Sequence, residues 1–113
     1  MKLSKKLIKK IEAAHFSIYQ YDDSFKFGKY SPAGQDFRFT IYYGDDWDLN
    51  DLAQAVLEYY TDFDVSYEAY IWLDDTGHGE NGAPYDMKDV YEDMRTCENY
   101  IYELYEIILE AIK

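Results

Sequence analysis

The chain has 113 residues, a formal net charge of −12 at pH 7, and hydrophobic and aromatic contents of 48% and 19%. These apolar contents are too high for a disordered acidic tail, and the length predicts a single domain over residues 1–113. The negative charge argues against direct binding to nucleic acid or to anionic lipid over most of the surface. We expect neither a signal peptide nor a membrane span, and the one cysteine, Cys97, favours a reducing, cytoplasmic location.

The charge is distributed unevenly along the chain. Residues 45–110 contain 19 Asp or Glu residues against two bases, Lys88 and Arg95, a balance of −17. Residues 1–44 contain eight bases against four acids, a balance of +4. A net charge this far from zero opposes the compact state, so we expect the acidic part to serve a function beyond solubility.

The first 43 residues predict one helix and three strands. Apolar residues at helical spacing over 3–14, with five lysines among residues 1–10, indicate an amphipathic helix with a basic outer face. The pattern then changes to a period of two, and a loop over 31–35 interrupts it. It predicts strands over 16–21, over 25–27, where Gly28 shortens the strand, and over 36–43.

The remainder of the chain predicts two helices and a fourth strand. Asp48 is a natural N-cap for a helix over 49–60, and Asp51 lies near its N-terminus, where carboxylates are favoured. Residues 65–73 alternate apolar and polar side chains and predict a strand, with a helix as the competing interpretation. The last helix, which starts at Pro84 or Asp86, has an apolar seam with 3-4-3-4-3-4-3 spacing: Met87, Val90, Met94, Cys97, Ile101, Leu104, Ile108 and Ala111.

These elements predict an α+β fold in the order α-β-β-β-α-β-α. In this fold a small antiparallel sheet of about four strands packs against three helices, of which the C-terminal one is the longest. The apolar seam of that helix could pack on the sheet or pair with a second copy in a coiled-coil homodimer. We expect it to pack on the sheet, because the sheet has an apolar face to cover.

The glycine-rich loop 74–82 is the segment that best suggests catalysis or metal binding. Asp74, Asp75, His78 and Glu80 could serve a metal-dependent enzyme, but their spacing fits neither a calcium loop nor a zinc site. The alternative is a turn-forming loop that caps the following helix. Cys97 falls on the apolar seam, which does not suit a nucleophile. We therefore expect no metal, no cofactor and no catalytic residue, and a protein that is not an enzyme.

Acidic residues form three clusters that could contact the cations of a partner. Like charges four residues apart destabilise a helix, and an ordinary solvated face mixes both signs, although solubility alone is the competing interpretation. Aromatic residues beside these acids could stack on arginine, whereas Tyr60 and Tyr67 are expected on apolar faces. The predicted partner-binding residues are Asp45, Asp46, Asp48, Asp51, Asp62, Asp64, Glu68, Asp89, Glu92, Asp93, Glu103, Glu106, Glu110, Tyr59, Tyr70, Trp72 and Tyr102.

The clusters Asp45-Asp46-Trp47-Asp48 and Asp62-Phe63-Asp64, with the acids of the last helix, give the chain the character of a known class. The chain resembles the small acidic DNA-mimic inhibitors of phages and mobile elements, of the anti-restriction and anti-CRISPR type. The resemblance implies a non-enzymatic inhibitor that occupies the basic nucleic-acid-binding surface of a restriction or CRISPR nuclease complex. The chain is also similar in size and charge to immunity proteins and antitoxins that neutralise basic toxins. The basic segment 2–10 departs from a uniformly acidic mimic.

Overall fold

A computed structural model describes residues 1–71 and 87–113 of the chain. The predicted α+β class and the long C-terminal helix are confirmed, but the described residues form three strands and four helices instead of four strands and three helices. Trp72 and the glycine-rich loop 74–82 lie outside the described residues. The elements are α1 (Lys5–Ala13), β1 (Ser17–Gln20), β2 (Ser24–Tyr30), β3 (Asp36–Tyr42), α2 (Leu49–Asp62), α3 (Val65–Ile71) and α4 (Met87–Ile112).

The three strands form an antiparallel sheet in the order β1-β2-β3. Phe27 at the centre of β2 pairs with Ile18 on one side and with Phe39 on the other. Because side chains alternate along a strand, one face of the sheet carries the apolar residues. The buried members of this inner face are Phe25, Phe27, Phe37, Phe39 and Ile41.

The prediction that Gly28 shortens the second strand is wrong, because β2 continues through Gly28 to Tyr30. Gly28 pairs with Ser17 of β1 and with Arg38 of β3. A Cβ atom at this position would lie 2.8 Å from the Oγ of Ser17, closer than real side chains approach. A larger residue here would therefore require the Ser17 and Arg38 side chains to move, but the glycine does not break the sheet.

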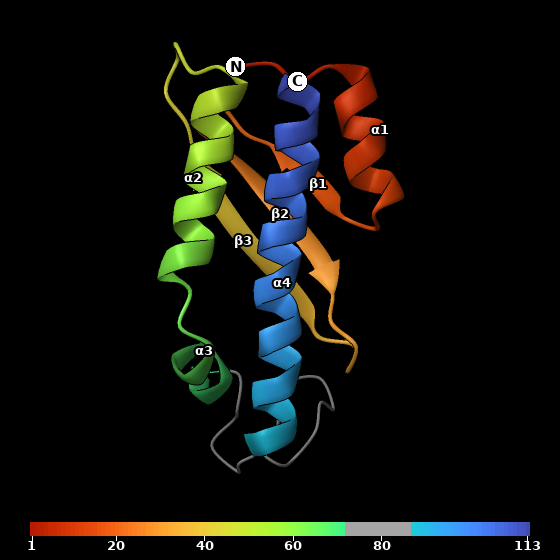
Figure 1. Ribbon diagram of the computed structural model, residues 1–113, viewed down its shortest axis with the longest axis vertical. Helices are drawn as coiled ribbons and strands as arrows, with labels where there is room; N and C mark the ends of the chain where they lie inside the picture. The colour runs from red at the N-terminus through yellow and green to blue at the C-terminus, as the bar shows by residue number, and fades with distance from the viewer. Residues whose placement is uncertain (72–86) are drawn as a thin grey trace.

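The described helices all lie on one face of the sheet, and none of them covers the other face (Figure 1). Helix α4 runs along the length of the molecule, with α1 on one side and α2 on the other, and both chain ends lie at the same end of the molecule. Helix α3 packs against the first part of α4. The buried residues of the sheet and of all four helices join in one hydrophobic core.

The apolar seam of the last helix is part of this core. Its side chains from Val90 to Ile108 are at most 3% exposed, while Ala111 is exposed. The predicted packing of this helix on the sheet is thus confirmed. Because the chain's own core occupies the seam, the seam is not free to form the coiled-coil homodimer that its spacing also allowed.

Residues 65–71 form helix α3, so the predicted fourth strand is wrong and the competing interpretation holds. The carboxylate of Asp64 accepts a hydrogen bond from the backbone N–H of Tyr67 at 3.1 Å, as an N-cap does. Val65 and Ala69, four residues apart, are buried on one side of this helix. Tyr67, expected on an apolar face, is 61% exposed.

Candidate protein-binding surface

Helix α4 carries a stripe of carboxylates on the side that faces away from the core. Positions 89, 92, 96, 99, 103, 106 and 110 repeat with 3-4 spacing, which keeps them on one side of a helix. Thr96 and Asn99 occupy the middle of the stripe. We call the five carboxylates the α4 acidic stripe: Asp89, Glu92, Glu103, Glu106 and Glu110. At 1.5 Å per residue it extends over about 32 Å.

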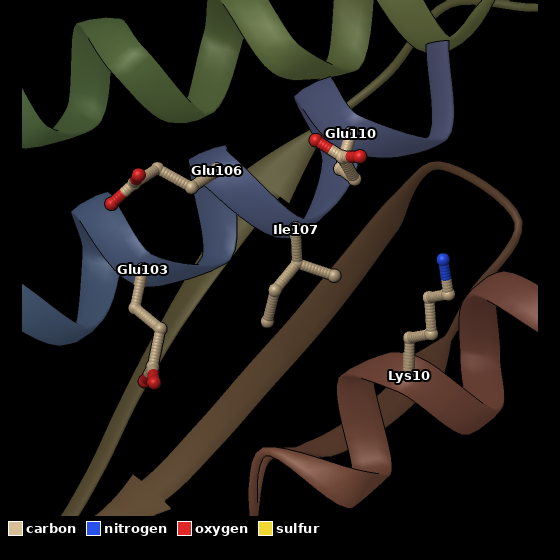
Figure 2. Close-up of a pocket in the computed structure, with 5 residues that line it drawn as sticks. All are labelled: Lys10, Glu103, Glu106, Ile107 and Glu110. Atoms are coloured by element: carbon tan, nitrogen blue, oxygen red, sulfur yellow. The ribbon is translucent and has the colours of Figure 1, made fainter. Parts of the chain in front are cut away.

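The C-terminal half of the stripe borders a groove between α1 and α4 with a volume of about 380 Å³. Figure 2 shows Glu103, Glu106 and Glu110 on α4, Ile107 pointing into the space between the helices, and Lys10 extending from α1. This α1–α4 groove therefore combines three carboxylates and one ammonium group with an apolar side chain. Such a lining suits a cationic side chain that has an aliphatic stem, such as Lys or Arg.

Two cations within the chain contact this half of the stripe. The Nζ of Lys29 donates a hydrogen bond to Oε1 of Glu103, while Lys113 lies 3.7 Å from Glu110. The Lys113–Glu110 pair is about two-thirds exposed on both sides, so it contributes little to stability. Glu106 and Glu110 are exposed and remain accessible to a partner.

Asp93 was predicted to lie in solvent with the other acids of the last helix, and this prediction is wrong. Its side chain is 6% exposed, and one carboxylate oxygen accepts a hydrogen bond from the backbone N–H of Ala33 at 3.0 Å. Asp93 thus holds the loop between β2 and β3 against α4. Asp89 and Glu92 line a hollow of about 360 Å³ beside this contact.

A second acidic cluster lies where α2 gives way to α3. Tyr59, Asp62 and Glu68, all predicted partner-binding residues, line one hollow of about 250 Å³ together with Phe63. Burial raises the pKa of Glu68, and the nearby charge of Asp64 raises it further. Asp64 itself caps α3.

The aromatic residues of the predicted site separate into packed and exposed ones. The ring of Tyr59 lies 5.0 Å from that of Phe39, and burial raises the pKa of its hydroxyl, so Tyr59 serves mainly the core. Tyr70 is 69% exposed. Tyr102 is partly exposed, and its ring lies 5.0 Å from that of Tyr60 on α2, so it helps to join the two helices.

The third predicted cluster precedes and begins α2. Asp48 and Asp51 form a capping box, in which each carboxylate accepts a hydrogen bond from the other residue's backbone N–H at 3.1 and 2.9 Å. The bond from the Asp51 backbone N–H is the main cause of the lowered pKa of Asp48. All four acids of this cluster are exposed, and Asp48 and Asp51 also cap α2.

The described residues show neither a reactive thiol nor a group of metal ligands. Cys97 is fully buried, and burial raises the pKa of its thiol to about 12, so it is not a thiolate at neutral pH. In the ranges 1–71 and 87–113, no three His, Cys, Asp or Glu side chains gather as metal ligands would. The candidate loop residues Asp74, Asp75, His78 and Glu80 lie outside these ranges.

Comparison with protein-family models, with curated proteins and with solved structures finds no match to this chain. Among the helices of the described residues, none has the length and apolar character needed to cross a membrane. The surface therefore has to be interpreted from its own geometry and charge.

Proposed function

We propose that this chain is a non-enzymatic inhibitor that presents the α4 acidic stripe to the basic nucleic-acid-binding surface of another protein. The carboxylates take the place of phosphates, so the inhibitor and nucleic acid compete for the same surface. The resemblance to DNA-mimic inhibitors suggests a cytoplasmic restriction or CRISPR nuclease complex as the partner.

The observation that carries the proposal is the position of the acids at the C-terminal end of α4. The helix dipole favours cations there, yet the last turn has no base, and Glu110 lies in it with Glu106 one turn earlier. At Glu110 the dipole costs about 0.3–1 kcal/mol, which the exposed Lys113 at 3.7 Å offsets in part, and the like-charge pair with Glu106 four residues earlier adds a few tenths. Solubility could be achieved by acids at positions without this cost.

The number of carboxylates along the α4 acidic stripe determines how many cationic side chains of a partner it can contact. Duplex DNA carries one charge per about 1.7 Å of axis, so about 32 Å of duplex carries roughly 19 charges, against five in the stripe. The stripe can therefore replace only a subset of phosphates and engage about as many Lys or Arg side chains. Neighbouring carboxylates one turn apart are closer than the screening length of about 8 Å at physiological salt, so their potentials add.

A competition experiment tests the proposal. The chain is used to capture partners from cells that express candidate nucleases, and duplex DNA is then titrated against the complex. We expect DNA to displace the chain, and the association rate to fall as salt rises, because the encounter is electrostatically steered. A nuclease that binds the chain and DNA together, with neither affecting the other, would contradict mimicry.

A matched pair of variants separates the stripe from net charge. The stripe variant Glu106→Gln/Glu110→Gln and the control Glu12→Gln/Asp22→Asn each remove two exposed carboxylates. We expect the dissociation constant of the complex to rise at least about tenfold in the stripe variant and to stay within about twofold of the unmodified value in the control. The reason is that charges in close contact across an interface contribute most of the electrostatic binding energy. Equal losses in both variants would show that only the total charge matters.

A further inference from the structure

The outer face of the sheet is the side that the described helices leave open (Figure 1). Strand register places Tyr19, Tyr30 and Tyr42 on this face, one from each strand, and Tyr21 follows β1 on the same side. All four side chains are more than half exposed. They are half of the eight large hydrophobic or aromatic residues that are exposed in the described part of the chain.

The centre of the outer face is flat and polar. Gly28 and Ser24 leave it without large side chains, and Lys26 pairs across the sheet with Tyr19 and Thr40. Arg38 lies beside them, and its guanidinium forms an ion pair with Asp36 at 2.8 Å. Tyrosine, glycine, serine and arginine are the residues that protein-binding surfaces favour, because tyrosine gives a large rigid contact and the small residues adapt to it.

The charge of the outer face differs from that of the rest of the chain. Its strands place two bases, Lys26 and Arg38, and one acid, Asp36, on this side, a balance of +1 in a chain whose net charge is −12. Nucleic-acid binding would need several phosphate contacts, whereas one of these two bases is already paired. The occupant is therefore expected to be a protein surface that is close to neutral.

We propose that two copies of the chain associate through their outer sheet faces. A two-fold axis brings the same patch of each copy together, so the Arg38–Asp36 ion pair of one copy can lie against that of the other and the tyrosines can pack between the sheets. This inference goes beyond the proposed function and does not depend on it.

Electrostatics favours this arrangement over a pairing of the two chains through their α4 helices. The α4 acidic stripe faces away from the core, on the opposite side of a molecule about 24 Å thick. In the dimer the two stripes are separated by more than that thickness, about three screening lengths at physiological salt. A pairing of α4 with α4 would instead bring carboxylates of the two copies together.

Sedimentation velocity over a concentration series, at low and high salt, tests this dimer. We expect a species of twice the chain's mass whose fraction rises with concentration and with salt, because salt screens the repulsion between two chains of net charge −12. Binding of the partner in the proposed function is instead expected to weaken as salt rises. The failure of one proposal can therefore be told apart from the failure of the other. A monomer at every concentration and salt would overturn the dimer.

Two double variants with matched exposure locate the interface. Tyr30→Asp/Tyr42→Asp changes the outer face, while Tyr67→Asp/Tyr70→Asp changes equally exposed positions on α3. We expect the dissociation constant of the dimer to rise at least about tenfold in the first variant and to stay within about twofold in the second. Circular dichroism melts check that both fold, and Tyr30→Ser/Tyr42→Ser replaces the first variant if it does not. Equal effects of both double variants would contradict the proposed face.

Discussion

Lys29 of β2 and Glu103 of α4 form an ion pair in which Nζ and Oε1 are 2.7 Å apart. The Lys29 side chain is only 14% exposed, and its Nζ lies 4.9 Å from the ring centroid of Phe16 and 4.4 Å from that of Tyr100. A cation held between two rings needs a carboxylate partner once water is excluded. Glu103 therefore ties α4 to the sheet, and it differs in this from the other acids of the stripe.

The first prediction compares Glu103 with its neighbour in the stripe. We expect Glu103→Gln to lower the free energy of unfolding by about 1–2 kcal/mol, because Lys29 keeps its charge and loses a charged acceptor. Glu106→Gln should change it by less than about 0.5 kcal/mol, because Glu106 is exposed. Urea unfolding of both variants measures the difference, and equal stability of the two would show that the Lys29 contact adds nothing.

The second prediction concerns the apolar seam of α4. Ile101→Ala or Leu104→Ala should cost about 2–5 kcal/mol, because each side chain is fully buried and its removal leaves a cavity. Ile71→Ala, at a position that is 45% exposed, serves as the control and should cost less than about 1 kcal/mol. Chemical unfolding midpoints that barely move for both seam variants would contradict the packing of α4 in the core.

The third prediction is that the thiol of Cys97 is protected by the fold. Its pKa is raised to about 12, chiefly by burial, so native protein should react with a thiol reagent at pH 8 far more slowly than protein unfolded in urea. With a disulfide reagent that releases a coloured thiolate when it reacts with a cysteine, the rate of reaction is followed by absorbance. Rapid labelling of the native chain would show that α4 detaches readily from the core.

The fourth prediction is a pH dependence that arises from Glu68. Burial and the charge of Asp64 raise its pKa in the folded state above the usual value of 4.5, so the folded state favours the protonated carboxyl. The resulting stability is fully present below about pH 4.5 and is lost as pH rises through the raised pKa. Glu68→Gln should therefore lose less stability than the unmodified chain between pH 4.5 and 7.

Unfolding free energies measured in urea across that pH range test the Glu68 prediction. The control is Glu58→Gln, which removes one exposed carboxylate from α2. Its stability should follow the pH dependence of the unmodified chain. If the Glu68 and Glu58 variants have the same profile, the pH dependence comes from overall charge and not from the partly buried carboxyl of Glu68.

Periodicity predicted the parts of the fold in which one face of an element meets the core. The alternation of Phe37, Phe39 and Ile41 and the 3-4 spacing of the α4 seam both correspond to buried faces. It failed over 65–71, where apolar and polar residues also alternate. There the buried pair Val65 and Ala69 is four residues apart, and the N-cap Asp64 was the signal that a helix begins.

The parts of the candidate site that sequence could not predict depend on contacts between distant residues. Asp93 and Ala33 are 60 positions apart, and Lys29 and Glu103 are 74 apart. Asp93 lies three residues after Val90 and four before Cys97, so helical periodicity already places it beside the seam. Nothing in the local sequence of α4, in contrast, distinguishes the paired Glu103 from the exposed Glu106. Which carboxylate is buried or paired is decided by the strand or loop that packs beside it.

The place of α4 in the chain has a consequence for its synthesis. Every element that α4 packs against precedes it, so the part of the inner sheet face and of α2 that the α4 seam covers stays exposed until that seam has been made. At about 5–20 residues per second, the ribosome needs roughly 1–5 s to add the 26 residues of this helix. During that interval the nascent sheet exposes a surface that chaperones recognise and that other nascent chains can bind.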